Sequence, residues 1–147
     1  MKQSGFSLLE VMVVIVIIAL FTAMIAPNII GEQEDAQLKK AAIDIRTLES
    51  ALQRYKLKIG SYPTTEQGLD ALVSAPTIDP IPRNYPEDGF IGSLMMDPWG
   101  NPYQLLSPGE MGRIDIYTNG PDGEAGTEDD IGNWNADKYL SKNNQEN

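Results

Sequence analysis

The sequence contains no cysteine and no histidine among its 147 residues. Without cysteine, the chain can form neither a disulfide nor a thiolate zinc site. Without histidine, it lacks the commonest general base and the commonest ligand of transition metals. Any metal ion bound by this chain is therefore expected to be a hard cation held by oxygen atoms.

Basic residues are also scarce. The chain has 11 Lys and Arg against 21 Asp and Glu, which gives a formal net charge of −10. No basic face is available to neutralise phosphates, so a nucleic acid is not expected as a partner. The acidic residues are unevenly placed, because residues 108–147 hold nine of them and only three basic residues.

Charge is nearly absent close to the N-terminus. Residues 6–26 are apolar except for Ser7, Glu10 and Thr22. Twenty-one helical residues would reach roughly 31 Å, enough to cross the core of a bilayer. A cleavable signal peptide is the alternative, but it would have a shorter apolar core, a longer basic start and no internal carboxylate. Lys2 before the predicted span places the N-terminus in the cytoplasm and the remainder outside.

Glu10 is the single charged residue of the predicted span. A charged group at the centre of a membrane helix costs about 3 kcal/mol on insertion scales. Glu10 lies near one end, so its carboxylate can either extend to the headgroups or pair with a positive charge at the same depth. Cleavage after Gly5 would create such a charge, the α-amino group of Phe6.

Residues 5–10, Gly-Phe-Ser-Leu-Leu-Glu, resemble the processing site of the type IV pilin superfamily. The resemblance implies that a prepilin peptidase cleaves after Gly5 and methylates the new N-terminal residue, Phe6. It also implies that Glu10 pairs with the N-terminal amine of a neighbouring subunit during filament assembly.

Helical periodicity continues beyond the predicted span. Apolar residues recur at intervals of three and four from residue 38 to residue 55, which predicts an amphipathic helix that ends at about residue 58, before Gly60. Pro27 is expected either to kink or unwind this helix locally or to mark the membrane exit. Thr64 and Gln67 form a capping-box pattern that predicts a short helix over 65–73. Proline-rich residues 75–96 are expected to form a loop.

Residues 97–103, Asp-Pro-Trp-Gly-Asn-Pro-Tyr, predict a turn. Trp99 and Tyr103 are expected to pack on the helix, since buried aromatic residues more often serve the core than a ligand. Strand-like residues follow at 103–106 and 113–117, which predicts a β-hairpin over 103–117. The fold class expected is α+β, with one long N-terminal helix packed on a small antiparallel β-sheet.

Residues 118–131 combine glycine with five carboxylates. Calcium takes six to eight oxygen ligands from carboxylates and carbonyls, and glycines allow the backbone to turn its carbonyls inward. The spacing does not fit an EF-hand, and a solvated acidic turn is the alternative interpretation. Trp134 is expected to anchor the end of this loop on the domain.

Residues 62–69, Tyr-Pro-Thr-Thr-Glu-Gln-Gly-Leu, and residues 97–103 resemble segments of the major pseudopilins of type II secretion systems. This resemblance implies a type IV pilin-like fold in which a C-terminal loop over 118–131 binds Ca²⁺. The carboxylates of Asp122, Asp129 and Asp130 match the calcium ligands of that family. Backbone oxygens of Asn119 and Thr127 are additional candidates, while Glu124 and Glu128 are expected to face solvent.

The resemblance implies a bacterial inner-membrane protein that polymerises into a periplasmic pseudopilus and helps drive folded proteins across the outer membrane. Its expected partners are copies of itself, minor pseudopilins, the inner-membrane assembly platform and the prepilin peptidase. The expected organisation is a cleaved leader at 1–5, a transmembrane helix at 6–26 and a periplasmic domain at 27–147, with a flexible tail at 141–147.

Two other functions are alternatives to this one. A major pilin of a type IV pilus usually closes its C-terminal region with a disulfide, which a chain without cysteine cannot form. A membrane-anchored enzyme could use Asp129 and Asp130 as acid and base. However, adjacent loop residues seldom point at one substrate atom, and no nucleophile accompanies them.

Overall fold

The computed structural model describes residues 7–141, and it describes their side chains except at positions 22–30. The predicted cleavage site at Gly5 and Phe6 and most of the predicted flexible tail, residues 142–147, lie outside the described residues. The chain divides into two compact units, Met1–Ala36 and Gln37–Asn147. Each unit is described by itself below.

Helix α1 (Leu8–Ile59) begins in the first unit. Its apolar side chains over residues 8–21 are exposed around the whole helix, and Leu9, Ile15 and Phe21 each show more than half of their surface. The helical assignment continues through Pro27, so the local unwinding considered for this position does not occur in the structure. Over residues 7–141, no helix combines the length and the apolar character needed to cross a membrane.

The part of α1 in the second unit provides the spine of the hydrophobic core. The predicted apolar stripe is buried from Ala41 onward, whereas its first member, Leu38, is partly buried, and Ala51 joins the stripe without having been predicted. The fully covered residues are Ala41, Ala42, Ile45, Leu48, Ala51, Leu52 and Tyr55. These positions share one face because residues three and four apart lie above one another on a helix. The helix ends at Ile59, and Gly60 follows with a φ of 101°, as expected for a glycine that terminates a helix.

The segment after α1 confirms one sequence prediction and corrects another. Thr64 and Gln67 form the predicted capping box, with Gln67 N donating to Thr64 Oγ1 at 3.2 Å and Thr64 N donating to Gln67 Oε1 at 3.1 Å. The short helix predicted over 65–73 forms over only part of this range. A turn is followed by the short 3₁₀-helix η1 (Leu69–Leu72). Gly68, with a φ of 62°, separates the two because this left-handed backbone cannot continue a helix.

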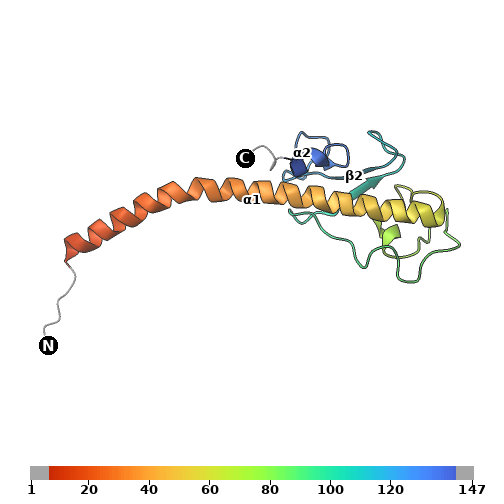
Figure 1. Cartoon of the computed structure of the whole chain (residues 1–147), viewed down its shortest axis with the longest axis horizontal. Coiled ribbons are helices and arrows are strands. Elements are labelled where there is room, and N and C mark those ends of the chain that lie inside the picture. Colours follow the sequence, from red (N-terminus) through yellow and green to blue (C-terminus); the bar gives the residue numbers. More distant parts are fainter. Residues whose placement is uncertain (1–6, 142–147) are drawn as a thin grey trace, which may run out of the picture. The chain divides into compact units, whose positions relative to one another are not determined.

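The predicted hairpin is confirmed as strands β1 (Gln104–Leu106) and β2 (Asp115–Thr118), which pair antiparallel with Leu105 opposite Ile116. A third strand, β3 (Ile131–Gly132), extends the sheet in the order β1-β2-β3 and was not predicted. The sheet contributes Leu105, Ile116 and Ile131 to the core cluster that includes the buried stripe of α1. Figure 1 shows β2 and the short helix α2 (Ala136–Ser141) along the C-terminal part of α1. Ser141 belongs to α2, so the predicted tail began one residue too early.

The hairpin loop between β1 and β2 is held by a buried carboxylate that the sequence did not single out. Asp115 accepts hydrogen bonds from the backbone amides of Glu110 at 2.6 Å, Met111 at 2.8 Å and Gly112 at 3.0 Å. Gly109 passes so close that a Cβ there would lie 2.6 Å from the carboxylate. Asp115 therefore fixes the shape of the loop through its backbone.

We expect Asp115→Ala to lower the free energy of unfolding by about 3 kcal/mol, because three amides would lose a charged acceptor. Chemical denaturation of the fragment 33–147 would measure this loss. All the buried core residues of the described chain lie in this fragment. Glu110→Ala removes an exposed carboxylate from the same loop and serves as the matched control. Equal stability of the two variants would contradict the role assigned to Asp115.

Candidate functional site

The acidic loop, residues 118–131, leaves the end of β2 and returns into β3. Thr118 and Ile131 face each other in the sheet and close the base of the loop. The Thr118 side chain is completely buried, and its hydroxyl donates to Oδ2 of Asp97. The base of the loop is thus attached to the interior of the domain.

Asp97 connects this base to the aromatic turn at 97–103. Its Oδ1 accepts hydrogen bonds from the amides of Trp99 at 3.0 Å and Asn101 at 2.7 Å. As predicted, Tyr103 is buried and Trp99 packs against the core cluster. The hydroxyl of Tyr103 donates to Oδ2 of Asp44 on α1 at 2.9 Å. Burial, reinforced by this carboxylate, raises the pKa of the Tyr103 phenol well above its ordinary value.

Each of the three expected calcium ligands accepts hydrogen bonds inside the loop. Asp129 accepts from the hydroxyl of Thr127 at 2.5 Å and from the amide of Asp122 at 3.2 Å. The bond from Thr127 is the main cause that lowers the pKa of Asp129 below its ordinary value. Asp122 Oδ1 accepts from the amide of Glu124 at 2.8 Å, and Asp130 Oδ2 accepts from the amide of Gly126 at 2.7 Å.

Two oxygen atoms of the loop are buried without a hydrogen-bond donor, namely Oδ1 of Asn119 and Oδ1 of Asp130. The side-chain nitrogen of Asn119, Nδ2, has a partner, since it donates a hydrogen bond to the carbonyl of Gly123 at 3.2 Å. A buried polar atom without a partner costs about 1–3 kcal/mol, and both atoms are of the oxygen type that calcium binds. Within residues 7–141, however, no three acidic residues lie together in an arrangement that could hold a metal ion.

The side-chain oxygen of Asn119 is a candidate ligand that sequence reasoning missed. The prediction assigned only backbone oxygens to Asn119 and Thr127. In the structure, the carbonyl of Thr127 accepts a hydrogen bond from the amide of Asp130 at 3.4 Å. Asparagine carbonyls are ordinary calcium ligands, so the residue type itself carried a signal for Asn119.

The end of the loop is held by the side chains of two asparagines in addition to Trp134. Asn133 accepts from the amide of Ile116 at 3.2 Å and donates to the carbonyl of Ile114 at 3.0 Å. Asn135 donates to the carbonyl of Asp130 at 2.9 Å and accepts from the amide of Gly132 at 2.9 Å. Trp134 covers Gly132 and packs against Tyr117 of β2 with ring centroids 6.1 Å apart, in line with its predicted role as an anchor, while 39% of its surface stays exposed.

Glu10 lies in the first turn of α1, where its side chain is exposed. Its amide donates to the carbonyl of Ser7 at 3.0 Å. A carboxylate is favourable there because backbone amides at a helix N-terminus carry a partial positive charge. The pairing predicted for Glu10 involves a second subunit and Phe6, which lies outside the described residues.

Two family models match this chain. The model described as "Type II secretion system (T2SS), protein G" covers residues 28–134, and the "Prokaryotic N-terminal methylation motif" covers residues 1–26. The chain belongs to the type II secretion system protein G family. This family is that of the major pseudopilin, a structural component of a secretion system.

Curated relatives extend the match along nearly the whole chain. The type II secretion system core protein G of Aeromonas hydrophila is 60% identical over 94% of this chain and 96% of its own length. The core protein G of Vibrio cholerae is 54% identical over 94% of this chain and 96% of its own length. The resemblance of the sequence to the major pseudopilins is therefore confirmed.

A solved structure supports the fold. The crystal structure of the major pseudopilin from the type 2 secretion system of enterohaemorrhagic Escherichia coli is 55% identical, with a TM-score of 0.68. The match covers 75% of this chain and 96% of the chain in that crystal structure. The predicted α+β, type IV pilin-like fold is confirmed. The methylation motif covers residues 1–26 and therefore includes Gly5, Phe6 and Glu10, the residues on which the resemblance to a processing site depends.

Proposed function

We propose that this chain is the major structural subunit of a type II secretion pseudopilus. It polymerises in the periplasm and helps drive folded proteins across the outer membrane. The observation that carries this proposal is the succession of the methylation motif at 1–26 and the protein G model at 28–134 along one chain. The similar proteins of Aeromonas hydrophila and Vibrio cholerae are both named as core components of a type II secretion system, which supports the secretion role.

The first unit is proposed to hold the precursor in the inner membrane, with its N-terminus in the cytoplasm. A prepilin peptidase then cleaves after Gly5 and methylates Phe6. Apolar side chains such as Leu9 and Phe21 are exposed on the isolated chain, and a surface of this kind requires either lipid or neighbouring helices. After assembly, the helices of other copies provide that cover. Minor pseudopilins and the inner-membrane assembly platform are the further proposed partners.

We also propose that the acidic loop holds a calcium ion. Asp122, Asp129 and Asp130 would supply carboxylate oxygens, and Asn119 would supply its side-chain oxygen, with backbone oxygens near Thr127. Because these three carboxylates are not gathered in one group among residues 7–141, ion binding would require the loop to bring them together. The buried, unpaired oxygens of Asn119 and Asp130 support this assignment. When bound, the ion supplies positive charge that offsets the repulsion among the carboxylates and holds the loop in one conformation. The residues themselves position this charge between β2 and β3.

An enzymatic role is not proposed for the acidic residues. Asp129 accepts hydrogen bonds from Thr127 and Asp122, whereas Asp130 accepts one from Gly126. Each carboxylate thus stabilises a different part of the loop backbone. This division of partners supports a structural role and gives no pair of groups aimed at a common substrate atom.

Complementation tests the proposed function. A bacterium that lacks its own major pseudopilin should regain secretion and periplasmic filaments when it expresses this chain. Gly5→Val should abolish both, because the precursor can no longer be cleaved, and immunoblots should show only the full-length form. Ser4→Ala, on the other side of the cleavage-site glycine, should be processed normally. Normal secretion by uncleaved Gly5→Val would contradict the proposal.

A further inference from the structure

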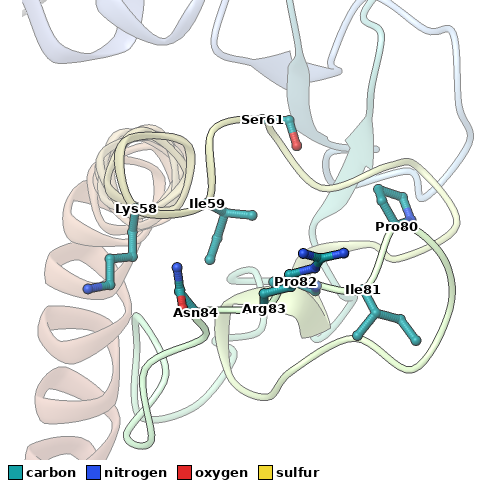
Figure 2. Close-up of a pocket in the computed structure, with 8 residues that line it drawn as sticks. All are labelled: Lys58, Ile59, Ser61, Pro80, Ile81, Pro82, Arg83 and Asn84. Carbon is teal, nitrogen blue, oxygen red and sulfur yellow. The ribbon is translucent and has the colours of Figure 1, made fainter.

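A pocket of about 360 Å³ lies beside the C-terminal end of α1. It is lined by Lys58, Ile59 and Ser61 at the end of the helix and by residues 80–84 of the proline-rich loop. Figure 2 shows the guanidinium group of Arg83 within the hollow, while Lys58 extends outward from the last turn of α1. Nothing in the proposed ion site involves this pocket.

Lys58 and Arg83 give the pocket a positive rim. Both side chains are exposed, and neither forms an ion pair or a side-chain hydrogen bond in the part of the chain that the structure describes. The neighbouring Asp79 is also exposed and forms no ion pair with either of them. In a protein with a net charge of −10, two unpaired cations at one pocket favour a negatively charged occupant.

The acidic loop supplies a matching negative surface on the same chain. Glu124 and Glu128 are exposed, and their carboxylates make no hydrogen bond or ion pair among residues 7–141. They are also distinct from the carboxylates proposed as calcium ligands. An ion bound by Asp122, Asp129 and Asp130 would leave the charge of both glutamates available for another surface.

The two surfaces lie at different levels along α1. Arg46 of α1 forms an ion pair with Asp137 of α2 at 2.7 Å, which places α2 beside the buried stripe of α1. Helix α2 follows the acidic loop closely in the sequence. The pocket begins at Lys58, twelve residues further along the helix, a distance of about 18 Å at 1.5 Å per residue. Figure 1 shows α2 beside the orange part of α1 and away from the yellow end of that helix. Filaments are built from contacts between two different, complementary surfaces of one subunit.

We propose that the acidic loop of one copy docks against the pocket of a second copy, with Glu124 and Glu128 facing Lys58 and Arg83. The contact would also cover Ile81, which is 56% exposed at the pocket. This inference rests on the proposed function, because it requires that the chain polymerises. It assigns the calcium ligands and the docking carboxylates to separate residues of one loop.

Disulfide capture tests the contact directly, because the chain has no native cysteine. The double variant Arg83→Cys with Glu124→Cys should give disulfide-linked ladders in assembled filaments after mild oxidation. The matched control, Arg113→Cys with Glu124→Cys, pairs the loop with an exposed residue at the tip of the hairpin and should give at least tenfold less product. Equal yields from the two pairs would overturn the proposal.

Charge exchange provides a second test with filament yield as the readout. Lys58→Glu with Arg83→Glu, and separately Glu124→Lys with Glu128→Lys, should each lower the yield about tenfold. Combining all four changes should restore at least a third of it. Thermal unfolding of each variant separates lost contacts from lost folding. Full assembly of either double variant, or no rescue in the combination, would overturn the inference.

The outcomes also distinguish this inference from the proposed function. If the unmodified chain forms no filament, the proposed function fails and the docking contact fails with it. If filaments form equally well in all variants, only the docking contact fails. Normal filaments with reduced secretion in Lys58→Glu, Arg83→Glu would overturn the contact in favour of a surface for the transported proteins.

Discussion

Chelation of calcium is expected to lower the thermal unfolding midpoint of the fragment 33–147 by about 10–20 °C. An ion present at a hundred times its dissociation constant stabilises the folded state by about 2.7 kcal/mol, and each kcal/mol shifts the midpoint of a domain of this size by several degrees. The comparison is a melting curve in calcium against one in excess EGTA. An unchanged midpoint would contradict the ion site and leave the filament argument in place.

Variants of the loop make this test specific. Asp129→Ala and Asp130→Asn should melt at the same temperature with and without calcium. Glu128→Gln, which changes an exposed carboxylate next to the proposed ligands in the sequence, should keep the full calcium-dependent rise in melting temperature. The pKa of Asp129 is lowered in the fold, so its contribution to stability is present above the ordinary carboxyl pKa of about 3.9 and is lost as the pH falls through the lowered value. The calcium response should therefore persist at pH 6 and disappear in strong acid.

Glu10→Ala is expected to reduce filament assembly at least tenfold while leaving the folded domain intact. In the proposed filament, the amine of Phe6 would lose its partner in an apolar environment, and an unpaired buried charge costs about 3–5 kcal/mol. Sheared filament yield measures assembly, and thermal unfolding of the full chain in detergent measures folding.

Ser7→Ala, which removes the other polar side chain near the start of α1, is the matched control for Glu10→Ala and should assemble normally. Wild-type filament levels in Glu10→Ala would show that the carboxylate only extends to the headgroups. A lower melting temperature would instead show that Glu10 stabilises the subunit.

The elements that were predicted correctly have local signals. The apolar stripe of α1 repeats over several turns, and the capping box needs only Thr64 and Gln67, three residues apart. The strand β3 gave no such signal, because two residues are too short to show a periodicity. It forms because Ile131 pairs with Thr118, far away in the sequence. Asn133 then binds the backbone of Ile116 and Ile114, which precede it by 17 and 19 residues.

The candidate site shows the same division. Composition indicated oxygen chemistry in the acidic loop, and the resemblance to the major pseudopilins selected Asp122, Asp129 and Asp130 among its carboxylates. It could not show that Asn119 and Asp130 each keep one oxygen buried and unpaired, because this depends on how the loop folds over itself. Asp97 and Asp115 were missed for a related reason. Their partners are mainly backbone amides, which every sequence contains.

The placement of the core residues has a consequence for synthesis of the chain. The buried stripe of α1 is synthesised early, but Ile131 and Ala136, which belong to the same core cluster, are synthesised last. Each strand of the sheet has four residues or fewer, so no hairpin can act as an independent folding nucleus. The apolar face of α1 therefore stays uncovered until the C-terminal residues of the chain have been synthesised. During that interval the nascent subunit is most exposed to aggregation and proteolysis.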